Sequence, residues 1–258
     1  MQYNTLLIEN KNPILYVTMN RPQSQNSINA ELLLELNAVL DAAENDRGLK
    51  VLVIRGQGGY FCRGMDFELI SNGEGMGDTN EGDMFTRLYS QTLRRISLIP
   101  RVIISLIEGQ AMAGGVGLAA ASDLVVATPN SEFSLSEALW GLLPAMVSPY
   151  LIRRVGFQKA YAMTLTTMPV SAEKAYEMHL VDELSENPEM ALRKLCQRLN
   201  RVEPDTIKDL KSFFRRMWII SDEMELEAAD ESFRLFSKPQ IRDNIVNFVV
   251  NKKFPWDK

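Results

Sequence analysis

The sequence predicts an α/β fold built around a largely parallel sheet. Of the 258 residues, 46% are hydrophobic, which is enough to form a sizeable core. Four β-rich runs stand out, and the last three are continuously apolar, as is typical of strands buried on both faces: 14–19, 51–54, 102–106 and 124–127. Helix-like segments separate these runs. Strands that alternate with helices indicate crossover connections and therefore parallel pairing.

Two helices are predicted between the strands. Residues 30–44 carry leucines at helical spacing and should form an amphipathic helix, and residues 84–96 are also helix-like. The segment before the second helix, 71–83, reads SNGEGMGDTNEGD and has almost no apolar content. Its glycines and acids predict a mobile loop beside the active site.

The last third of the chain is predicted to be mainly helical. We expect a boundary near 202–204, which divides the chain into a core of residues 1–202 and a helical region of residues 203–258. Residues 193–216 hold eight basic and three acidic side chains, whereas 222–231 holds six acidic and no basic ones, a pattern typical of solvated helix faces. The expected helices cover 171–178, 188–199, 205–220 and 221–236.

Composition excludes several classes of function. One histidine cannot form a zinc site rich in histidine, and the two cysteines, Cys62 and Cys196, lack the spacing of a metal site or a disulfide framework. A net charge of −5 argues against nucleic-acid binding. The longest uncharged stretch, 138–152, is too short to span a membrane, and the N-terminus does not resemble a signal peptide. We therefore expect a cytoplasmic protein without a metal.

The most informative segment is 108–123, EGQAMAGGVGLAAASD, which follows the apolar run at 102–106. The pair Gly114–Gly115 allows close backbone approach, and a helix that begins here would present free N–H groups to a negatively charged ligand. A tight turn without a ligand would give the same pattern. The segment is neither a dinucleotide fingerprint nor a phosphate loop, because the required spacings are missing.

A second loop, 58–67, also follows a predicted strand and reads GGYFCRGMDF. One backbone N–H from this loop and one from the glycine segment would together form an oxyanion hole. Cys62 lies in this loop, but a nucleophilic cysteine needs a nearby base, so we interpret it as structural. His179 is interpreted as a structural or surface residue, because no serine or acid pattern accompanies it.

Glu137 lies in an otherwise apolar stretch, FSLSEALWGLLP. Burial raises the pKa of a carboxyl group, which suits a general acid or base near neutral pH. The alternative is an ordinary carboxylate at the start of a helix, capped by Ser134 or Ser136. The segment alone does not decide between these interpretations.

Taken together, the motifs resemble the crotonase (enoyl-CoA hydratase/isomerase) superfamily over essentially the whole chain. They occur in a fixed order: NRPQSQNSIN, YFCRGMDF, EGQAMAGGVGL, SDLVVAT and FSLSEALWGLLP. The resemblance implies a spiral ββα core, a C-terminal helical region and homotrimers or hexamers. It implies that the backbone N–H groups of Met65 and Gly114 hold the thioester oxygen, and that Glu137 is catalytic.

The hydratase pattern has two glutamates, and the first of them falls on Gly117 here. The segment from FSLSEALWGLLP onward and the ending FPWDK are similar to the dehydratase-type crotonases of polyketide β-branching. This similarity implies conversion of 3-hydroxy-3-methylglutaryl-acyl carrier protein to 3-methylglutaconyl-acyl carrier protein. The substrate would be carried on a phosphopantetheine thioester, with no further cofactor.

The substrate's distal carboxylate requires a cation, and Arg63, Arg87, Arg94 and Arg95 are candidates. Tyr89 is a candidate for a hydrogen bond, and we expect the substrate-binding set to include Asp66, Gly115 and Gly117. Because carrier proteins are acidic, we expect a basic rim that binds one, with contributions from Arg153, Arg154, Lys159 and the basic residues of 193–216.

Other activities remain open at this stage. An enoyl-thioester isomerase or a decarboxylase of the same fold also needs only one carboxylate. A non-catalytic acyl-thioester-binding scaffold protein is an alternative from another class, favoured by glycine at 117 and opposed by Glu137 and the Gly114–Gly115 pair.

Overall fold

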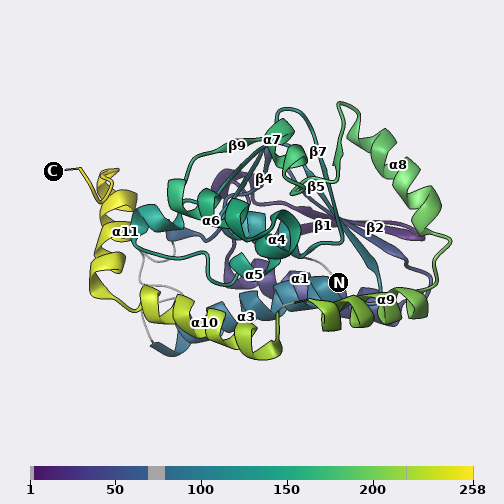
Figure 1. The fold of residues 1–258 in the computed structure, drawn as a ribbon, viewed down its shortest axis with the longest axis horizontal. Coiled ribbons are helices and arrows are strands. Elements are labelled where there is room, and N and C mark those ends of the chain that lie inside the picture. The colour runs from purple at the N-terminus through teal and green to yellow at the C-terminus, as the bar shows by residue number, and fades with distance from the viewer. Residues whose placement is uncertain (1–2, 69–78, 219, 258) are drawn as a thin grey trace.

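The computed structural model describes residues 3–68, 79–218 and 220–257. It confirms the α/β class with a largely parallel sheet, as Figure 1 shows. The larger sheet has six strands in the order β1-β2-β3-β5-β7-β10, and every neighbouring pair is parallel except β1 with β2. Its strands are β1 (Leu6–Lys11), β2 (Ile14–Met19), β3 (Val51–Gly56), β5 (Val102–Ile107), β7 (Leu124–Ala127) and β10 (Glu183–Leu184).

A smaller sheet accounts for the spiral. Its order is β4-β6-β8-β9, with strands β4 (Tyr60–Cys62), β6 (Gln110–Met112), β8 (Glu132–Ser134) and β9 (Val170–Ser171). The chain adds one strand to each sheet and then a helix, as in β3-β4-α3 and β5-β6-α4. This is the predicted ββα repeat. The smaller sheet was not predicted, because strands of two or three residues carry too little periodicity.

The helices match the prediction in most places. The predicted helices 30–44, 84–96, 171–178, 188–199, 205–220 and 221–236 correspond to α1 (Ala30–Asn45), α3 (Thr79–Leu98), α7 (Ala172–Glu177), α8 (Pro188–Leu199), α9 (Pro204–Met217) and α10 (Asp222–Phe236). Most of the predicted loop at 71–83 lies outside the described residues. Its last part was wrongly predicted, because α3 already begins at Thr79. The helices not predicted are α5 (Ser148–Val155), α6 (Phe157–Thr166) and α11 (Pro239–Asn251).

Both faces of the larger sheet are covered. The main core lies between the sheet and helices that include α1, α3 and α4 (Gly114–Ala121). On the other side, Leu192 and Cys196 of α8 pack with Ile207 of α9. These contacts cross the boundary expected near 202–204, and the division into residues 1–202 and 203–258 stays a prediction. Helix α10 packs along α3, and α11 and the C-terminus lie at the far end of the molecule from α8 (Figure 1). No described helix is both long and apolar enough to cross a membrane.

Candidate active site

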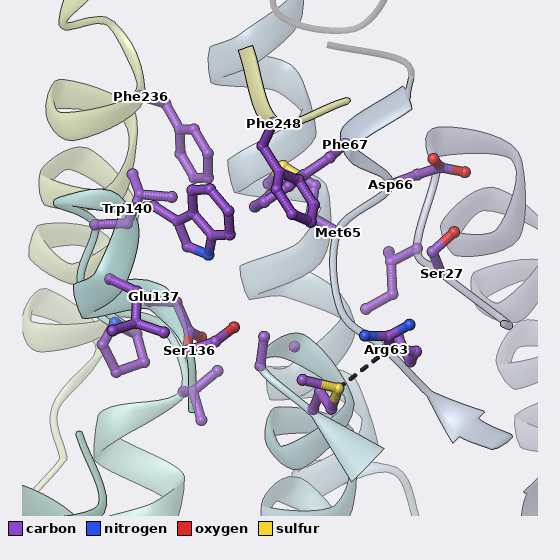
Figure 2. A pocket seen from close by; sticks show the side chains of 18 of the residues that line it. Ser27, Arg63, Met65, Asp66, Phe67, Ser136, Glu137, Trp140, Phe236 and Phe248 are labelled. Carbon is purple, nitrogen blue, oxygen red and sulfur yellow. Dashed lines mark hydrogen bonds between the residues drawn. The ribbon is translucent and has the colours of Figure 1, made fainter. Parts of the chain in front are cut away.

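A cavity of about 620 Å³ brings together the loop after β4, the start of α4, the short helix η2 (Glu137–Trp140) and the C-terminal segment. Figure 2 shows Ser136 and Glu137 on one wall and Arg63 on the opposite wall. Aromatic side chains gather at one end of the cavity. A volume of this size suits a small organic substrate.

Gly64 allows the two loops of the predicted oxyanion hole to meet. Its φ is +80°, and a Cβ at this position would lie 2.6 Å from the Cβ of Ala113 and 3.2 Å from the nitrogen of Gly114. Ile28 fixes the loop from the other side, because its N–H donates to the carbonyl of Gly64 and its carbonyl accepts from the N–H of Asp66. Only a glycine gives this close approach without strain.

The backbone N–H groups of Met65 and Gly114 have no hydrogen-bond acceptor among the described residues. Gly114 is the first residue of α4, whose opening N–H groups lack partners within the helix. Ala113, just before it, has φ 49° and ψ −118°, a conformation that is costly for a residue with a side chain. Both Met65 and Gly114 line the cavity, as an oxyanion hole requires.

Glu137 lies in the same cavity and is only partly exposed. Its carboxyl oxygen Oε2 is buried and has no hydrogen-bond partner. Burial raises the pKa of Glu137 to about 7. Glu137 is the first residue of η2, but the side chain of Ser136, at the N-cap position, makes no capping hydrogen bond to this helix. The environment therefore fits an acid–base group better than a capped helix carboxylate.

Tyr89 is part of the cavity wall. Its side chain is buried, and its hydroxyl donates to the carbonyl of Gly114 over 2.7 Å. A Cβ at Gly117 would lie 2.2 Å from that hydroxyl oxygen, so Tyr89 fills the space in which a side chain at 117 would begin. Tyr89 lines the cavity, and its hydroxyl bonds to the protein backbone, so a hydrogen bond from Tyr89 to the substrate stays a prediction.

Three residues of the predicted substrate-binding set, Gly115, Gly117 and Asp66, make close contacts with the protein itself. A Cβ at Gly115 would lie 2.2 Å from the carbonyl oxygen of Cys62, so this glycine lets α4 pack on β4. Neither Gly115 nor Gly117 is among the described residues that line the cavity. Asp66 does line it, but its carboxylate pairs with Arg21 at 2.8 Å.

The prediction for Arg95 is wrong, because this side chain points away from the cavity. Its guanidinium donates to Asn37 and pairs with Asp41, both on α1. Arg94 pairs with Asp222 and Glu225 of α10. Neither arginine is among the described residues that line the cavity.

Arg87 likewise binds Asp83 and Asp230 and is not part of the cavity wall. Of the predicted cations, Arg63 alone lies in the wall that the structure describes. Its side chain donates to the sulfur of Met112 and to the amide oxygen of Gln25.

The sequence did not point to Lys252 and the aromatic end of the cavity. Lys252 follows α11 and lines the cavity. Trp140 contacts the rings of Phe67, Phe248 and Phe254, with centroids between 4.8 and 5.8 Å apart. The aromatic ending FPWDK carries Phe254 of this group, but by itself it does not indicate a cavity wall.

The candidate carrier-binding arginines of α5 have a structural role. Arg153 donates to the carbonyl of Ala120, and Arg154 donates to the carbonyl of Ser122 and pairs with Asp182. These cations lie at the C-terminal end of α4, where they stabilise the free carbonyls and the helix dipole. This corrects the expectation that both form part of a docking rim.

Cys62, Cys196 and His179 are not among the described residues that line the cavity. Cys62 and Cys196 are free and buried, and burial raises the pKa of the Cys62 thiol to about 12, which suits a structural cysteine. His179 is exposed after α7. In the part of the chain that the structure describes, no group of three or more His, Cys, Asp or Glu side chains could hold a metal ion.

Comparisons with known proteins agree with this geometry. Residues 9–258 match the enoyl-CoA hydratase/isomerase family. The chain is 34% identical to the bacillaene synthase dehydratase PksH of Bacillus subtilis, over 99% of this chain and 97% of that protein. It is 27% identical to a short-chain-enoyl-CoA hydratase of Clostridium acetobutylicum, over 98% and 97%.

The fold is similar to that of solved structures. A polyketide biosynthesis enoyl-CoA hydratase (pksH) from Bacillus subtilis aligns with a TM-score of 0.91 at 32% identity, covering 98% of this chain and 100% of that one. An enoyl-CoA hydratase from Mycobacterium avium aligns with a TM-score of 0.85 at 26% identity, covering 99% and 100%. These relatives confirm the predicted enzyme class, a hydro-lyase. The chain belongs to the enoyl-CoA hydratase/isomerase, or crotonase, family.

Proposed function

We propose that this enzyme converts 3-hydroxy-3-methylglutaryl-acyl carrier protein to 3-methylglutaconyl-acyl carrier protein. The observation that carries the proposal is the carboxyl group of Glu137, which has a buried, unpartnered oxygen in the same cavity as Met65 and Gly114. The similarity to a protein named as a bacillaene synthase dehydratase supports the choice of dehydration.

The chemistry needs one carboxyl group and two N–H donors. Glu137 as carboxylate takes the proton from C2, and the N–H groups of Met65 and Gly114 stabilise the negative charge that develops on the thioester oxygen. The same carboxyl group then gives the proton to the hydroxyl at C3. The C3–O bond breaks, water leaves, and a double bond forms between C2 and C3.

The distal carboxylate of the substrate would bind a cation in the cavity wall. Arg63 and Lys252 are suitable, because both line the cavity and neither forms an ion pair with a carboxylate among the described residues. Arg63 is one of the cations predicted from the sequence, and Lys252 is a new candidate. A hydrophobic substrate without this carboxylate would not use either charge.

We also propose that the acyl carrier protein binds near the cavity, with its phosphopantetheine arm as the only carrier of the substrate and no other cofactor. The basic residues of α8 lie at the opposite end of the molecule from α11 (Figure 1), so Lys252 and Lys253 are better placed to receive an acidic carrier.

Self-association and location are part of the same proposal. Exposed apolar side chains on α6, just after it and on α9, among them Leu165, Met168, Phe214 and Met217, support assembly into a homotrimer or hexamer. A cytoplasmic location fits the free cysteines.

Mass spectrometry of the carrier-bound product tests the function. The wild-type enzyme should remove water from the 3-hydroxy-3-methylglutaryl thioester, and Glu137→Gln should reduce the rate by at least about 10²-fold, within the usual range for general acid–base catalysis. Loss of carbon dioxide would instead identify a decarboxylase, and a shifted double bond in an enoyl thioester an isomerase. Tight acyl-carrier binding without turnover would support the scaffold alternative.

A further inference from the structure

The contact between Tyr89 and α4 has a consequence for catalysis beyond the oxyanion hole itself. Tyr89 belongs to α3, and both Gly114 and Gly117 belong to α4. The tyrosine hydroxyl donates to the carbonyl of Gly114 over 2.7 Å, and its side chain is 4% exposed. Gly114 is also the residue whose N–H group has no acceptor among the described residues and lies at the cavity.

The fit beside Gly117 depends on the tyrosine oxygen. A Cβ at Gly117 would lie 2.2 Å from the Tyr89 hydroxyl oxygen but 3.4 Å from its ring carbon Cζ. The first distance is a severe overlap, and the second is an ordinary van der Waals contact. Val147 also approaches, with Cγ2 at 2.8 Å. The hydroxyl group is therefore the nearer of two side-chain groups that crowd position 117.

We infer that Tyr89 is a positioning residue of this active site: its hydroxyl fixes the first turn of α4 and occupies the space in which a side chain at Gly117 would begin. Asp66 also lines the cavity, and its carboxylate is held by Arg21. This arrangement holds the first turn of α4, and with it the N–H donor of Gly114, in the same cavity as Glu137.

A double-mutant cycle tests the geometry by thermal unfolding, independently of the substrate. Gly117→Ala should lower the melting temperature by several degrees in the wild-type background. In the Tyr89→Phe background the ring stays and the overlapping oxygen is gone, so Gly117→Ala should cost clearly less. The contact with Val147 is present in both backgrounds and cancels. Equal costs in both backgrounds would overturn the inference.

The catalytic part rests on the proposed function and has its own readout. Tyr89→Phe should lower kcat for dehydration by about 10-fold or more, because small displacements of catalytic groups cost up to about 10²-fold, and should leave KM within about twofold. A purely structural role would lower the amount of folded enzyme and leave kcat per folded molecule unchanged, and that result would contradict the inference.

A second assay separates failure of the inference from failure of the proposed function. The enzyme should exchange the C2 hydrogen of a butyryl phosphopantetheine thioester with D₂O, because enolate formation needs the N–H donors and Glu137 but no leaving hydroxyl. If wild type exchanges hydrogen without dehydrating, and Tyr89→Phe slows the exchange, the inference stands and the proposed substrate is wrong. If Tyr89→Phe exchanges at the wild-type rate, the inference fails.

Discussion

A Cβ placed on Gly64 would lie 2.6 Å from the Cβ of Ala113, so the loop after β4 and the loop before α4 touch at a point where no side chain fits. The contact fixes the distance between the N–H groups of Met65 and Gly114. We expect Gly64→Ala to push the loops apart and to lower kcat by about 10²-fold, because one oxyanion-hole donor is worth about 10²–10³ in rate. Steady-state kinetics on the carrier-bound substrate measures this effect.

Gly59→Ala is the matched control. Gly59 has φ +79°, almost the same as Gly64, but no atom lies within 4 Å of the position that its Cβ would take. Both substitutions therefore impose a similar backbone strain, and Gly64→Ala adds the steric overlap. If the two variants lose the same activity, the loop contact does not position the donors.

Glu137 should make the folded state less stable as the pH rises. Its folded-state pKa is raised from 4.5 to about 7, so the folded protein binds the proton more tightly than the unfolded chain does. Its contribution to stability is therefore present below about pH 4.5 and is lost as the pH rises through about 7. Glu137→Gln should raise the free energy of unfolding at pH 8 by as much as about 3 kcal/mol, and by less at pH 5. Denaturant titrations at both pH values test this, and a benefit that is independent of pH would contradict it.

The rate should depend on pH through the same group. If Glu137 first removes the C2 proton, the free enzyme must hold it as carboxylate, and kcat/KM should rise with pH through about 7. A profile that falls through this range would show that the protonated acid starts the reaction. The residual activity of Glu137→Gln should lack this titration.

Lys252 should recognise the distal carboxylate of the substrate. Lys252→Met should raise KM for the 3-hydroxy-3-methylglutaryl phosphopantetheine thioester about fivefold, because an exposed charge pair contributes about 1 kcal/mol. KM for the analogous thioester without the carboxylate should stay unchanged. Lys253→Met is the control, because Lys253 is adjacent and exposed but does not line the cavity. Equal effects on both thioesters would exclude this role.

Binding of the carrier protein should weaken as salt concentration rises. Lys253→Glu should lower its affinity several-fold at low ionic strength, since charge reversal at a docking rim opposes an acidic partner. Arg198→Glu, on α8 at the other end of the molecule (Figure 1), should have little effect. Isothermal titration at two salt concentrations measures both, and a larger effect of Arg198→Glu would move the docking site to α8.

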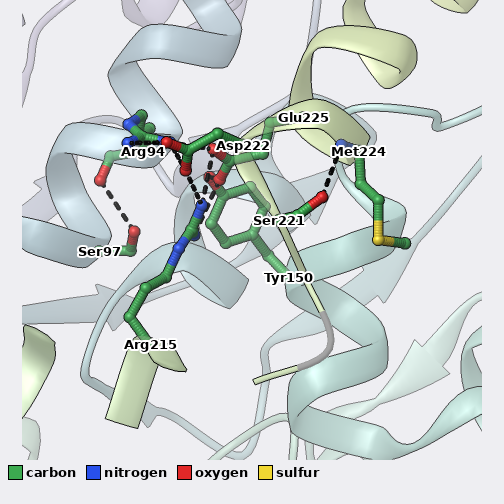
Figure 3. A network of polar contacts seen from close by, with 8 residues as sticks. All are labelled: Arg94, Ser97, Tyr150, Arg215, Ser221, Asp222, Met224 and Glu225. Carbon is green, nitrogen blue, oxygen red and sulfur yellow. Dashed lines mark hydrogen bonds and ion pairs between the residues drawn. The ribbon is translucent and has the colours of Figure 1, made fainter. Parts of the chain in front are cut away.

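One polar network shows why sequence alone misplaced some cations. Figure 3 shows Arg94 and Arg215 around Asp222 and Glu225, with the Tyr150 hydroxyl donating to Glu225. In the sequence, the basic residues of 193–216 and the acidic residues of 222–231 predict solvated helix faces. Part of that charge instead joins α9 and α10 to α3, because the folded chain brings these helices together.

The local elements could be predicted from the sequence. Apolar runs marked β2, β3, β5 and β7, and leucine spacing marked α1, because burial of a strand or a helix face leaves a periodic pattern in neighbouring residues. The order of the motifs also led to Glu137 and to the backbone donors at Met65 and Gly114.

The tertiary structure decided which cations line the cavity. It also decided which side chain lies against Gly117. Arg95 and Lys252 carry no local signal that distinguishes a cavity wall from a helix interface. The sequence by itself determined that glycine stands at 117, where a glutamate would complete the hydratase pattern. Only the folded chain placed the Tyr89 hydroxyl in that space, because the contact joins two helices whose packing depends on the whole core.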